Sequence, residues 1–303
     1  MDRLDAMAVF QTVVEAGSLS AAGRKLGMPL ATVSRKLSEL EAHLKARLLV
    51  RSTRRLTLTD AGHAYFASCK RILEDVAEAE HTASGEYTTP KGELIVTAPI
   101  VFGRLHVLPI TTEFLKAYPQ VDVRLHLGDR ISNLLEDHID LAVRIGELPD
   151  SNLSATRVGK IRRVVCGSPA YFDAHGTPQL PAELTAHQCI AFDGLMSPGA
   201  WAFKVKGVDV SVPIQTRLIA NTAEAAIDAA ISGFGITRVL SYQIDSAEQA
   251  GLLRVVLADF ELAALPVNLI YSKQGRLPVK LRAFLDFALP RLRERMRAME
   301  YEL

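Results

Sequence analysis

The sequence is poor in the features that disulfide-rich, secreted and membrane proteins need. Its 303 residues include three cysteines, Cys69, Cys166 and Cys189, which are too few and too scattered for a disulfide framework and suit a reducing compartment. No run of 18 apolar residues is present, so we expect no membrane-spanning helix. The first residues lack the basic and then apolar layout of a signal peptide. These absences predict a soluble, cytoplasmic protein.

Sequence patterns for catalysis and metal binding are also missing. The eight histidines include no pair at i,i+3 or i,i+4 spacing and have no Cys-x-x-Cys partner, which argues against a metal site. There is no Gly-x-Ser-x-Gly sequence and no phosphate loop, and Gly233-Phe234-Gly235 lacks the third glycine of a dinucleotide-binding loop. We therefore expect no catalytic residues, no metal and no cofactor. A redox pair of Cys166 and Cys189 stays open as an alternative, because Arg162 and Arg163 precede Cys166.

What the sequence does contain is a globular composition with an uneven charge distribution. It is 49% hydrophobic and 23% charged, and its length predicts two or three structural units. Residues 1–60 contain ten Lys/Arg and six Asp/Glu, whereas residues 91–303 contain 23 of each. The basic excess predicts a polyanionic partner for the N-terminal segment, and a merely solvated basic face is the alternative.

The spacing of apolar residues predicts three helices in this basic segment, at residues 2–16, 19–26 and about 30–48. Gly17 ends the first helix, and Ser18 caps the second. A tight turn with Gly27 and Pro29 joins the second helix to the third, whose apolar seam is Val33, Leu37, Leu40, Leu44 and Leu48. Two helices joined in this way indicate a helix-turn-helix, which places its second helix in the major groove of DNA.

The polar residues beside that seam indicate how DNA is contacted. Hydroxyl and basic side chains supply the donors that read base edges. The candidate residues in the helices and the turn are Ser18, Pro29, Thr32, Ser34, Arg35 and Lys36. The sequence pattern of residues 49–59 predicts a small β-wing. Its Arg51, Arg54 and Arg55 would contact phosphates or enter a minor groove. A helical bundle with a basic surface is the alternative.

The segment after the wing predicts a long helix at residues 59–86. Its apolar positions follow the heptad pattern of a coiled coil; they are Tyr65, Cys69, Ile72, Val76, Ala79 and Ala83. This seam predicts pairing with a second copy of the chain, which would present two reading heads to a two-fold operator. Packing of the seam against its own domain is the alternative.

Beyond a hinge at residues 88–92, strand and helix patterns alternate and predict mostly parallel sheets in two α/β lobes. The expected strands of lobe I (90–162 and 266–303) are 93–98, 121–127, 139–145 and 266–272, with helices at 102–117, 131–137 and 278–297. Those of lobe II (163–265) are 163–166, 189–192, 208–212, 217–220 and 236–240, with a helix at 222–231.

Ligands bind such sheets at the carboxyl ends of their strands, and helix N-termini there favour anions. We therefore expect a small organic anion, a carboxylate, between the lobes. The candidate residues are Ala98, Pro99, Ile100, Val101, Asp129, Arg144, Asn221, Thr222 and Gly235. Arg144 could instead bridge to a surface acid, and the charge of Asp129 opposes a carboxylate unless Arg144 or Arg130 intervenes.

Four runs in the basic segment, at residues 18–26, 31–37, 40–41 and 56–62, resemble the LysR-type transcriptional regulators. Met28 departs from the serine and Leu49 from the phenylalanine that the family often has. The resemblance implies a winged helix-turn-helix at 1–60, a dimer-forming linker helix at 61–89, and an effector-binding domain of periplasmic-binding-protein type at 90–303. In that domain, residues 98–101, 129 and 221–222 would line the cleft.

Residues and resemblance together predict a sequence-specific regulator that binds double-stranded promoter DNA and is controlled by a small-molecule effector. The resemblance further implies a tetramer that bends DNA. Ligand binding would rearrange the lobes, and the linker helices would change the spacing of the reading heads. The alternative is a solute-binding module, or an enzyme, whose basic segment serves assembly; no acid–base pair for catalysis is apparent.

Overall fold

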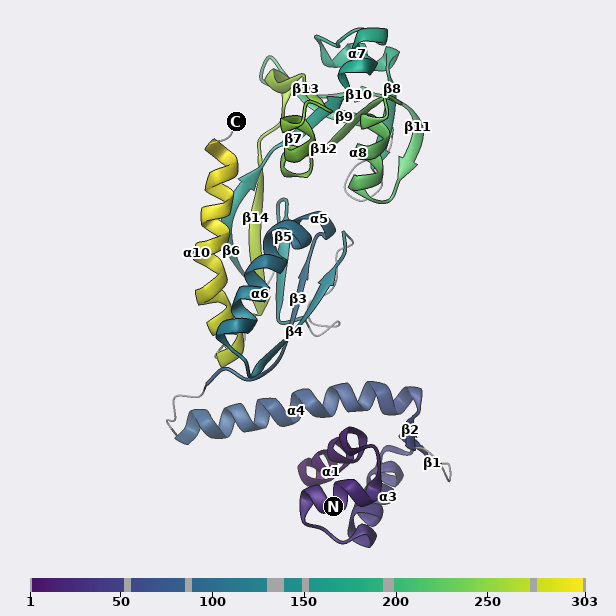
Figure 1. Cartoon of the computed structure of the whole chain (residues 1–303), viewed down its shortest axis with the longest axis vertical. Coiled ribbons are helices and arrows are strands. Elements are labelled where there is room, and N and C mark those ends of the chain that lie inside the picture. Colours follow the sequence, from purple (N-terminus) through teal and green to yellow (C-terminus); the bar gives the residue numbers. More distant parts are fainter. Residues whose placement is uncertain are drawn as a thin grey trace. The chain divides into compact units, whose positions relative to one another are not determined.

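The computed structural model describes residues 2–51, 56–84, 89–129, 139–148, 153–192, 199–272 and 277–301 (Figure 1). The chain forms two compact units, Met1–Thr89 and Pro90–Leu303. Each unit has its own hydrophobic core and is described by itself below.

The first unit contains three short helices, a two-stranded wing and a long helix. The elements are α1 (Arg3–Ala16), α2 (Leu19–Leu26), α3 (Leu30–Leu44), β1 (Leu49–Arg51), β2 (Leu56–Leu58) and α4 (Asp60–Ser84). Asp2 caps α1 by accepting backbone N–H groups, and Gly17 ends it with φ of 69°. The apolar stripe of α1 is Ala6, Val9, Phe10 and Val13. Leu4 in the first turn is exposed.

The third helix ends at Leu44, four residues earlier than its apolar seam predicts. Lys45 takes a left-handed conformation with φ of 51°. The carboxylate of Glu41 then accepts the N–H groups of Leu48 at 2.8 Å and Leu49 at 3.2 Å, which directs the chain into the wing. Leu48 still enters the core, but from the loop that leads to β1.

Hydrogen bonds and close packing hold the start of α4 against the residues that lead into the wing. The hydroxyl of Thr59 donates to the carbonyl of Arg47 at 2.7 Å and accepts the N–H of Gly62 at 2.9 Å. A Cβ at Gly62 would lie 2.0 Å from the carbonyl oxygen of Leu48, so only glycine fits there. Packing at the start of α4 therefore explains why the LysR-like pattern includes Thr59 and Gly62.

The second unit begins with lobe I, the part built on a five-stranded sheet in the order β4-β3-β5-β14-β6. Its strands are β3 (Gly92–Ala98), β4 (Val121–Leu127), β5 (Leu141–Ile145), β6 (Leu153–Ile161) and β14 (Leu265–Ser272). Strand β3 is parallel to β4 and β5, whereas β14 is antiparallel to β5 and β6. A helical segment of α5 (Ile100–Phe102), π-helix η1 (Gly103–Val107) and α6 (Leu108–Ala117) follows β3.

Helix α10 (Val279–Tyr301) lies beside α6 on one face of this sheet (Figure 1). The rings of Phe114 and Phe284 meet there with centroids 5.0 Å apart. The helix predicted at 131–137 lies outside the described residues. Strand β6 was not expected, because its residues between 153 and 161 mix polar and apolar side chains without a clear period.

Lobe II is built on a second sheet in the order β11-β8-β12-β7-β13. The strands are β7 (Arg163–Gly167), β8 (Gln188–Phe192), β11 (Gln215–Ala220), β12 (Ile236–Leu240) and β13 (Arg254–Val256). Helix α8 (Ala223–Ile231) covers one face. The other face packs on α7 (Pro169–His175), the 3-10 helix η2 (Pro181–Ala186) and the hairpin of β9 (Ala200–Val205) and β10 (Val208–Pro213).

Two expectations for lobe II need correction. The segment 208–212 is not a strand of the main sheet, because it pairs only with β9 in the hairpin. Both sheets are mixed rather than mostly parallel, since β7 and β13 run antiparallel to their neighbours as β14 does in lobe I. The prediction of an N-terminal helix-turn-helix, a linker helix and a two-lobed α/β domain is confirmed.

The chain crosses between the lobes twice, from β6 to β7 and from lobe II into β14. The short 3-10 helices η3 (Ser241–Gln243) and η4 (Ala258–Phe260) and helix α9 (Asp245–Gln249) lie between β12 and β14 in the chain. Arg162, on the first crossing, donates to both carboxylate oxygens of Glu261 on the second at 3.3 and 3.4 Å. The hydrophobic core is continuous through both lobes.

Candidate nucleic-acid interface and effector site

Helix α3 presents one face to its own core and the opposite face to solvent. Val33, Leu37 and Leu40 are buried and fix the rotation of the helix. Leu30, Ala31, Arg35 and Ser38 are exposed, with Thr32 and Ser34 half-buried beside them. A helix with hydroxyl, arginine and small apolar side chains on its free face has the groups that read base edges in a major groove.

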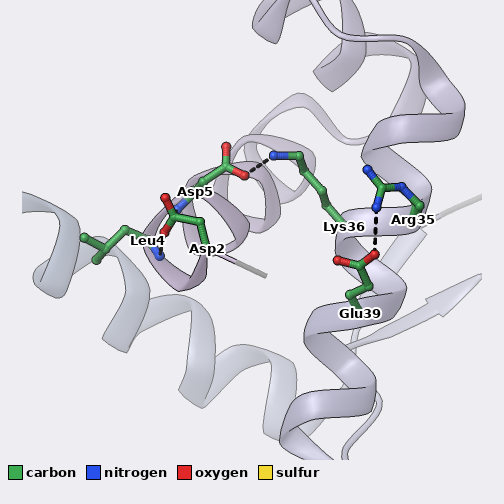
Figure 2. Close-up of polar contacts among 6 residues, drawn as sticks. All are labelled: Asp2, Leu4, Asp5, Arg35, Lys36 and Glu39. Atoms are coloured by element: carbon green, nitrogen blue, oxygen red, sulfur yellow. Dashed lines mark hydrogen bonds and ion pairs between the residues drawn. The ribbon is translucent and has the colours of Figure 1, made fainter.

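Arg35 and Lys36 follow each other in the sequence but have different surroundings (Figure 2). The Arg35 side chain is 66% exposed and forms a 2.9 Å ion pair with Glu39 on the next turn. The Lys36 side chain is 22% exposed and pairs with Asp5 of α1. An exposed pair within one helix contributes only about 0.3–0.5 kcal/mol, so Arg35 can exchange Glu39 for a base or phosphate. Lys36 instead joins α3 to α1.

Ser18 and Pro29 lie at the amino ends of the two helices of the motif. The Ser18 hydroxyl accepts the N–H of Ala21 at 3.1 Å and so caps α2. Pro29 precedes α3 and is exposed. Leu30, next to it, is 50% exposed, and an apolar side chain there can contact a thymine methyl group. The sequence-based candidates did not include Leu30, although an apolar residue outside the buried seam indicates a role at the surface.

The wing pairs β1 with β2 in antiparallel register, with Arg51 opposite Leu56. Arg51 therefore lies at the end of β1. Arg54 and Arg55 lie outside the described residues, and their DNA-contacting role stays a prediction.

In lobe I, the carboxyl ends of β3, β4 and β5 lie at one edge of the sheet, because these strands are parallel. This brings together Ala98, Asp129 and Arg144. The N–H of Ile100, which follows Pro99, donates to the Asp129 carboxylate at 3.2 Å. Burial raises the pKa of Asp129, that hydrogen bond lowers it, and Glu224 of lobe II raises it further. One of the helix-terminal N–H groups expected to bind a ligand anion is thus occupied by the protein's own carboxylate.

Arg144 is half-buried at the end of β5. Its Nη1 donates to the carbonyl of Val143 at 3.0 Å, and its Nη2 is buried without a partner in the described part of the chain. Burial lowers the pKa of its guanidinium. Val101 is buried in the core behind this edge.

In lobe II, Asn221 and Thr222 follow β11 at the carboxyl edge of its sheet. The Thr222 hydroxyl accepts the N–H of Ala225 at 3.3 Å and caps α8. Asn221 is exposed. Gly235 does not belong to this group. It precedes β12 at the opposite edge of the sheet, where a Cβ would lie 2.4 Å from the carbonyl oxygen of Gln188.

The two carboxyl edges meet through three contacts. Arg104 of η1 lies 3.9 Å from the carboxylate of Glu224 in the first turn of α8. The Tyr242 ring, after β12, packs on Phe102 and His106 with centroids 5.5 and 5.6 Å away. Sequence reasoning missed Tyr242, although its position two residues after a strand end was a usable signal.

The polar atoms at this junction are incompletely bonded. His106 Nε2 is buried without a hydrogen-bond partner in the described part of the chain. Tyr242 Oη is also buried and has no hydrogen bond of good geometry there, although the Gln243 side chain and the Phe102 backbone lie close enough to lower its pKa. Burial, and then the charge of Arg295, lower the pKa of His106 to about 4, so its ring is neutral near pH 7. Burial raises the pKa of Tyr242, as does the charge of Asp129. Such groups hydrogen-bond polar ligands well.

The idea of a Cys166–Cys189 redox pair is wrong. Strand β12 separates the two residues, with Thr237 opposite Cys166 and Ile236 opposite Cys189. Adjacent residues of a strand point to opposite faces, and the two thiols accordingly lie in different core clusters. Both cysteines are free, and burial raises the pKa of each to about 12.

None of the helices described has the length and apolarity needed to cross a membrane. No group of three or more His, Cys, Asp or Glu side chains among the described residues could hold a metal ion.

Two family models match the chain. One, described as the LysR substrate binding domain, matches residues 88–293. The other, described as the bacterial regulatory helix-turn-helix protein of the lysR family, matches residues 4–63. An HTH-type transcriptional regulator of Xanthomonas campestris pv. campestris (strain 8004) is 36% identical over 289 residues, which cover 94% of this chain and 84% of that protein.

Two solved structures are similar to this chain. CrgA, a LysR-type transcriptional regulator from Neisseria meningitidis, matches with a TM-score of 0.61 and 34% identity over 95% of this chain and 98% of that one. AphB, described as a Vibrio cholerae virulence activator of the LTTR protein family, matches with a TM-score of 0.61 and 28% identity, covering 95% of this chain and 98% of that one.

Proposed function

This chain belongs to the LysR family of DNA-binding transcriptional regulators, which are not enzymes, and on that premise we propose that a small organic anion controls it from the junction of its two lobes. The observation that carries the proposal is a pair of buried polar side chains where the carboxyl edges of both sheets meet. Among the described residues, His106 Nε2 has no hydrogen-bond partner and Tyr242 Oη has none of good geometry. Polar groups that converge in an apolar setting are typical of small-molecule sites.

The arrangement of charges refines where the anion binds. Asp129 occupies the Ile100 N–H, so the amino end of α8 and Arg104 are the positions that favour a carboxylate. Binding there would compete with Glu224 for Arg104, since the two side chains now lie 3.9 Å apart. The rest of the effector would present a hydrogen-bond donor to Asp129 and an apolar surface to Phe102. The ligand we propose is therefore a hydroxylated or aminated carboxylic acid.

A thermal-shift screen tests this proposal. Carboxylic acids of this type are expected to raise the melting temperature of the full-length protein, and their amides are not, because the amide removes the charge. Arg104→Gln is expected to lose the shift. Arg124→Gln is the matched control, since Arg124 is an equally exposed arginine of lobe I that pairs with Glu93 on the sheet. Equal shifts with acids and amides would contradict the anionic effector.

For DNA, we propose that α3 enters the major groove with Arg35, Ser34 and Thr32 toward the bases. Ser18 and Pro29, at helix amino ends, would lie near phosphates, and Arg51, Arg54 and Arg55 of the wing would contact the backbone or the minor groove. Lys36 would act through its Asp5 pair by holding the reading helix in place.

Salt dependence distinguishes this function from a solute-binding module with a basic assembly segment. Binding to a fragment of the protein's own promoter should weaken steeply with salt, because each neutralised phosphate releases counterions. Arg54→Ala should weaken binding to every sequence and reduce the salt slope by about one. A protein that binds the effector but ignores promoter DNA at low ionic strength would favour the alternative.

We also propose that the chain acts as a homodimer through α4 and assembles further into a tetramer. Tyr65 and Cys69 of the heptad seam are used within their own domain, against Phe10 and its neighbours. Ile72, Leu73 and Val76 lie outside that core cluster and are only half-buried, so the partner chain would cover this later part. Exposed Leu105, Leu108, Leu218 and Ile219 of the regulatory unit offer further apolar surface for a second contact between copies.

Light scattering after size-exclusion chromatography tests the assembly. Val76→Lys should convert the assembly into smaller species, because a charge on the seam cannot be desolvated. Ala67→Lys is the control on the same helix, since Ala67 is exposed. If both variants keep the mass of the parent protein, the seam does not form the dimer.

A further inference from the structure

Two arginines, Arg163 and Arg238, lie on the face of the lobe II sheet that is remote from α8, and Arg162 is next to them in the crossing segment. In the antiparallel register of β7 and β12, Arg238 lies opposite Val165 and Arg163 lies opposite Leu240. Residues two apart on a strand share a face, so Arg163 and Arg238 are on the side of Val165, under the β9–β10 hairpin. Arg162 directly precedes Arg163 and lies on the crossing between the lobes.

Arg238 is the unusual member, because its side chain has almost no access to water. The residue is 4% exposed, and its guanidinium packs over the Phe203 ring at 5.3 Å from the centroid. Its Nε is buried without a hydrogen-bond partner among the described residues, and so is the Nε of Arg162. Buried charges are normally paired and hydrogen-bonded.

Glu261 is an acid that acts on this cluster. Its single negative charge does not neutralise the positive charge of the arginines. Glu261 bonds to Arg162 at 3.3 and 3.4 Å, which are long for an ion pair. Burial raises the pKa of Glu261. Burial and the charge of Arg163 lower the pKa of Arg238 to about 10, against the effect of Glu261. Glu261 thus acts on Arg162 and Arg238, while Arg163 faces Arg238. Two guanidinium N–H groups of the cluster have no acceptor among the described residues.

We propose that the cluster of Arg162, Arg163 and Arg238 is a second anion site, which takes a small tetrahedral oxyanion or a carboxylate. Guanidinium groups bind such anions through paired, charge-assisted hydrogen bonds. Arg163 is half-buried and Arg162 is 35% exposed along its side chain, so the anion enters from solvent beside the crossing segments.

The site has a consequence for regulation. It is distinct from the junction between the carboxyl edges, because its residues lie on the opposite face of the lobe II sheet from α8. Its ligand would displace Glu261 from Arg162 and so remove a contact between the two crossings. An anion bound here would therefore influence how the lobes move relative to each other.

Calorimetric titration of the full-length protein with sodium sulfate, at constant ionic strength, tests the site. Arg238→Met should weaken sulfate binding by about tenfold or more, because a charge-assisted hydrogen bond is lost. Glu261→Gln should tighten it, because the competing carboxylate is gone. Arg217→Gln is the control, since Arg217 is an exposed arginine of β11 in the same lobe and should leave the sulfate affinity unchanged.

Several results would overturn the proposal. They are the absence of sulfate binding in the parent protein, equal affinities in the parent and Arg238→Met, or a loss with Arg217→Gln as large as that with Arg238→Met. If Arg238→Met fails to fold, Glu261→Gln decides, because an unchanged or weaker affinity in that variant contradicts competition by Glu261. Sulfate lacks the organic part of the effector that we propose for the lobe junction. These results are therefore independent of the effector screen.

Discussion

Replacing Arg35 and Lys36 one at a time should separate reading of DNA from support of the reading helix. Arg35→Ala removes an exposed side chain whose 2.9 Å pair with Glu39 contributes about 0.3–0.5 kcal/mol. The stability of the free protein should hardly change. A two-pronged contact between arginine and guanine contributes about 1–3 kcal/mol of discrimination, so preference for the operator should fall by roughly 5- to 150-fold.

Lys36→Met should have the opposite pattern. Its ammonium pairs with Asp5 on another helix and is mostly shielded from water, so the loss should lower the free energy of unfolding by about 1 kcal/mol. The preference for the operator over unrelated DNA should stay close to that of the parent protein. Asp5→Asn, which breaks the same pair from the other side, should reproduce the loss of stability (Figure 2).

Fluorescence anisotropy with labelled operator and scrambled duplexes measures the preference, and thermal unfolding without DNA measures stability. The reasoning is refuted if Arg35→Ala weakens both duplexes equally, since that is the behaviour of a phosphate contact. It is also refuted if Lys36→Met abolishes the preference while stability stays the same.

Three further outcomes follow from the packing and the titratable groups. Gly62→Ala should prevent stable folding of the first unit, because the new Cβ would lie 2.0 Å from a backbone oxygen of Leu48; Gly17→Ala, with open space at φ of 69°, should cost only about 1 kcal/mol. The stability of the regulatory unit should fall by up to about 3 kcal/mol between pH 6.5 and 4, because the unfolded state protonates His106 while the folded state, with a pKa of about 4, resists it. Thermal melts of His106→Leu should lose that part of the pH dependence. Dilute peroxide should leave DNA binding unchanged, because the buried Cys166 and Cys189 thiols, with pKa values of about 12, form no thiolate near pH 7; a peroxide effect that Cys166→Ser removes would contradict this.

Local sequence signals were sufficient for the DNA-binding unit. Helix periodicity, the Ser18 cap and the glycine turns specify elements that form within about 60 residues, and their order identifies the motif. The end of α3 was misjudged, because the apolar seam continues to Leu48 after the helix has stopped. The carboxylate of Glu41 and the left-handed Lys45 end it, and neither follows from periodicity.

The effector region was harder because its residues come from distant parts of the chain. Parallel strand order correctly indicated that Ala98, Asp129 and Thr222 lie at carboxyl edges. It gave no indication that Asp129 bonds the N–H of Ile100, or that Tyr242 packs on Phe102. Gly235 precedes β12 and lies at the opposite edge, where a Cβ would lie 2.4 Å from the carbonyl oxygen of Gln188.

The sequence by itself determined the family, the order of the domains and the basic reading helix, because these depend on residues close together in the chain. Only the tertiary structure decided which charges are already paired. It joined Lys36 to Asp5, left Arg35 at the surface and placed Glu261 beside Arg162 and Arg238. Charge pairing depends on distances between residues far apart in sequence, and those distances exist only once strands and helices have packed.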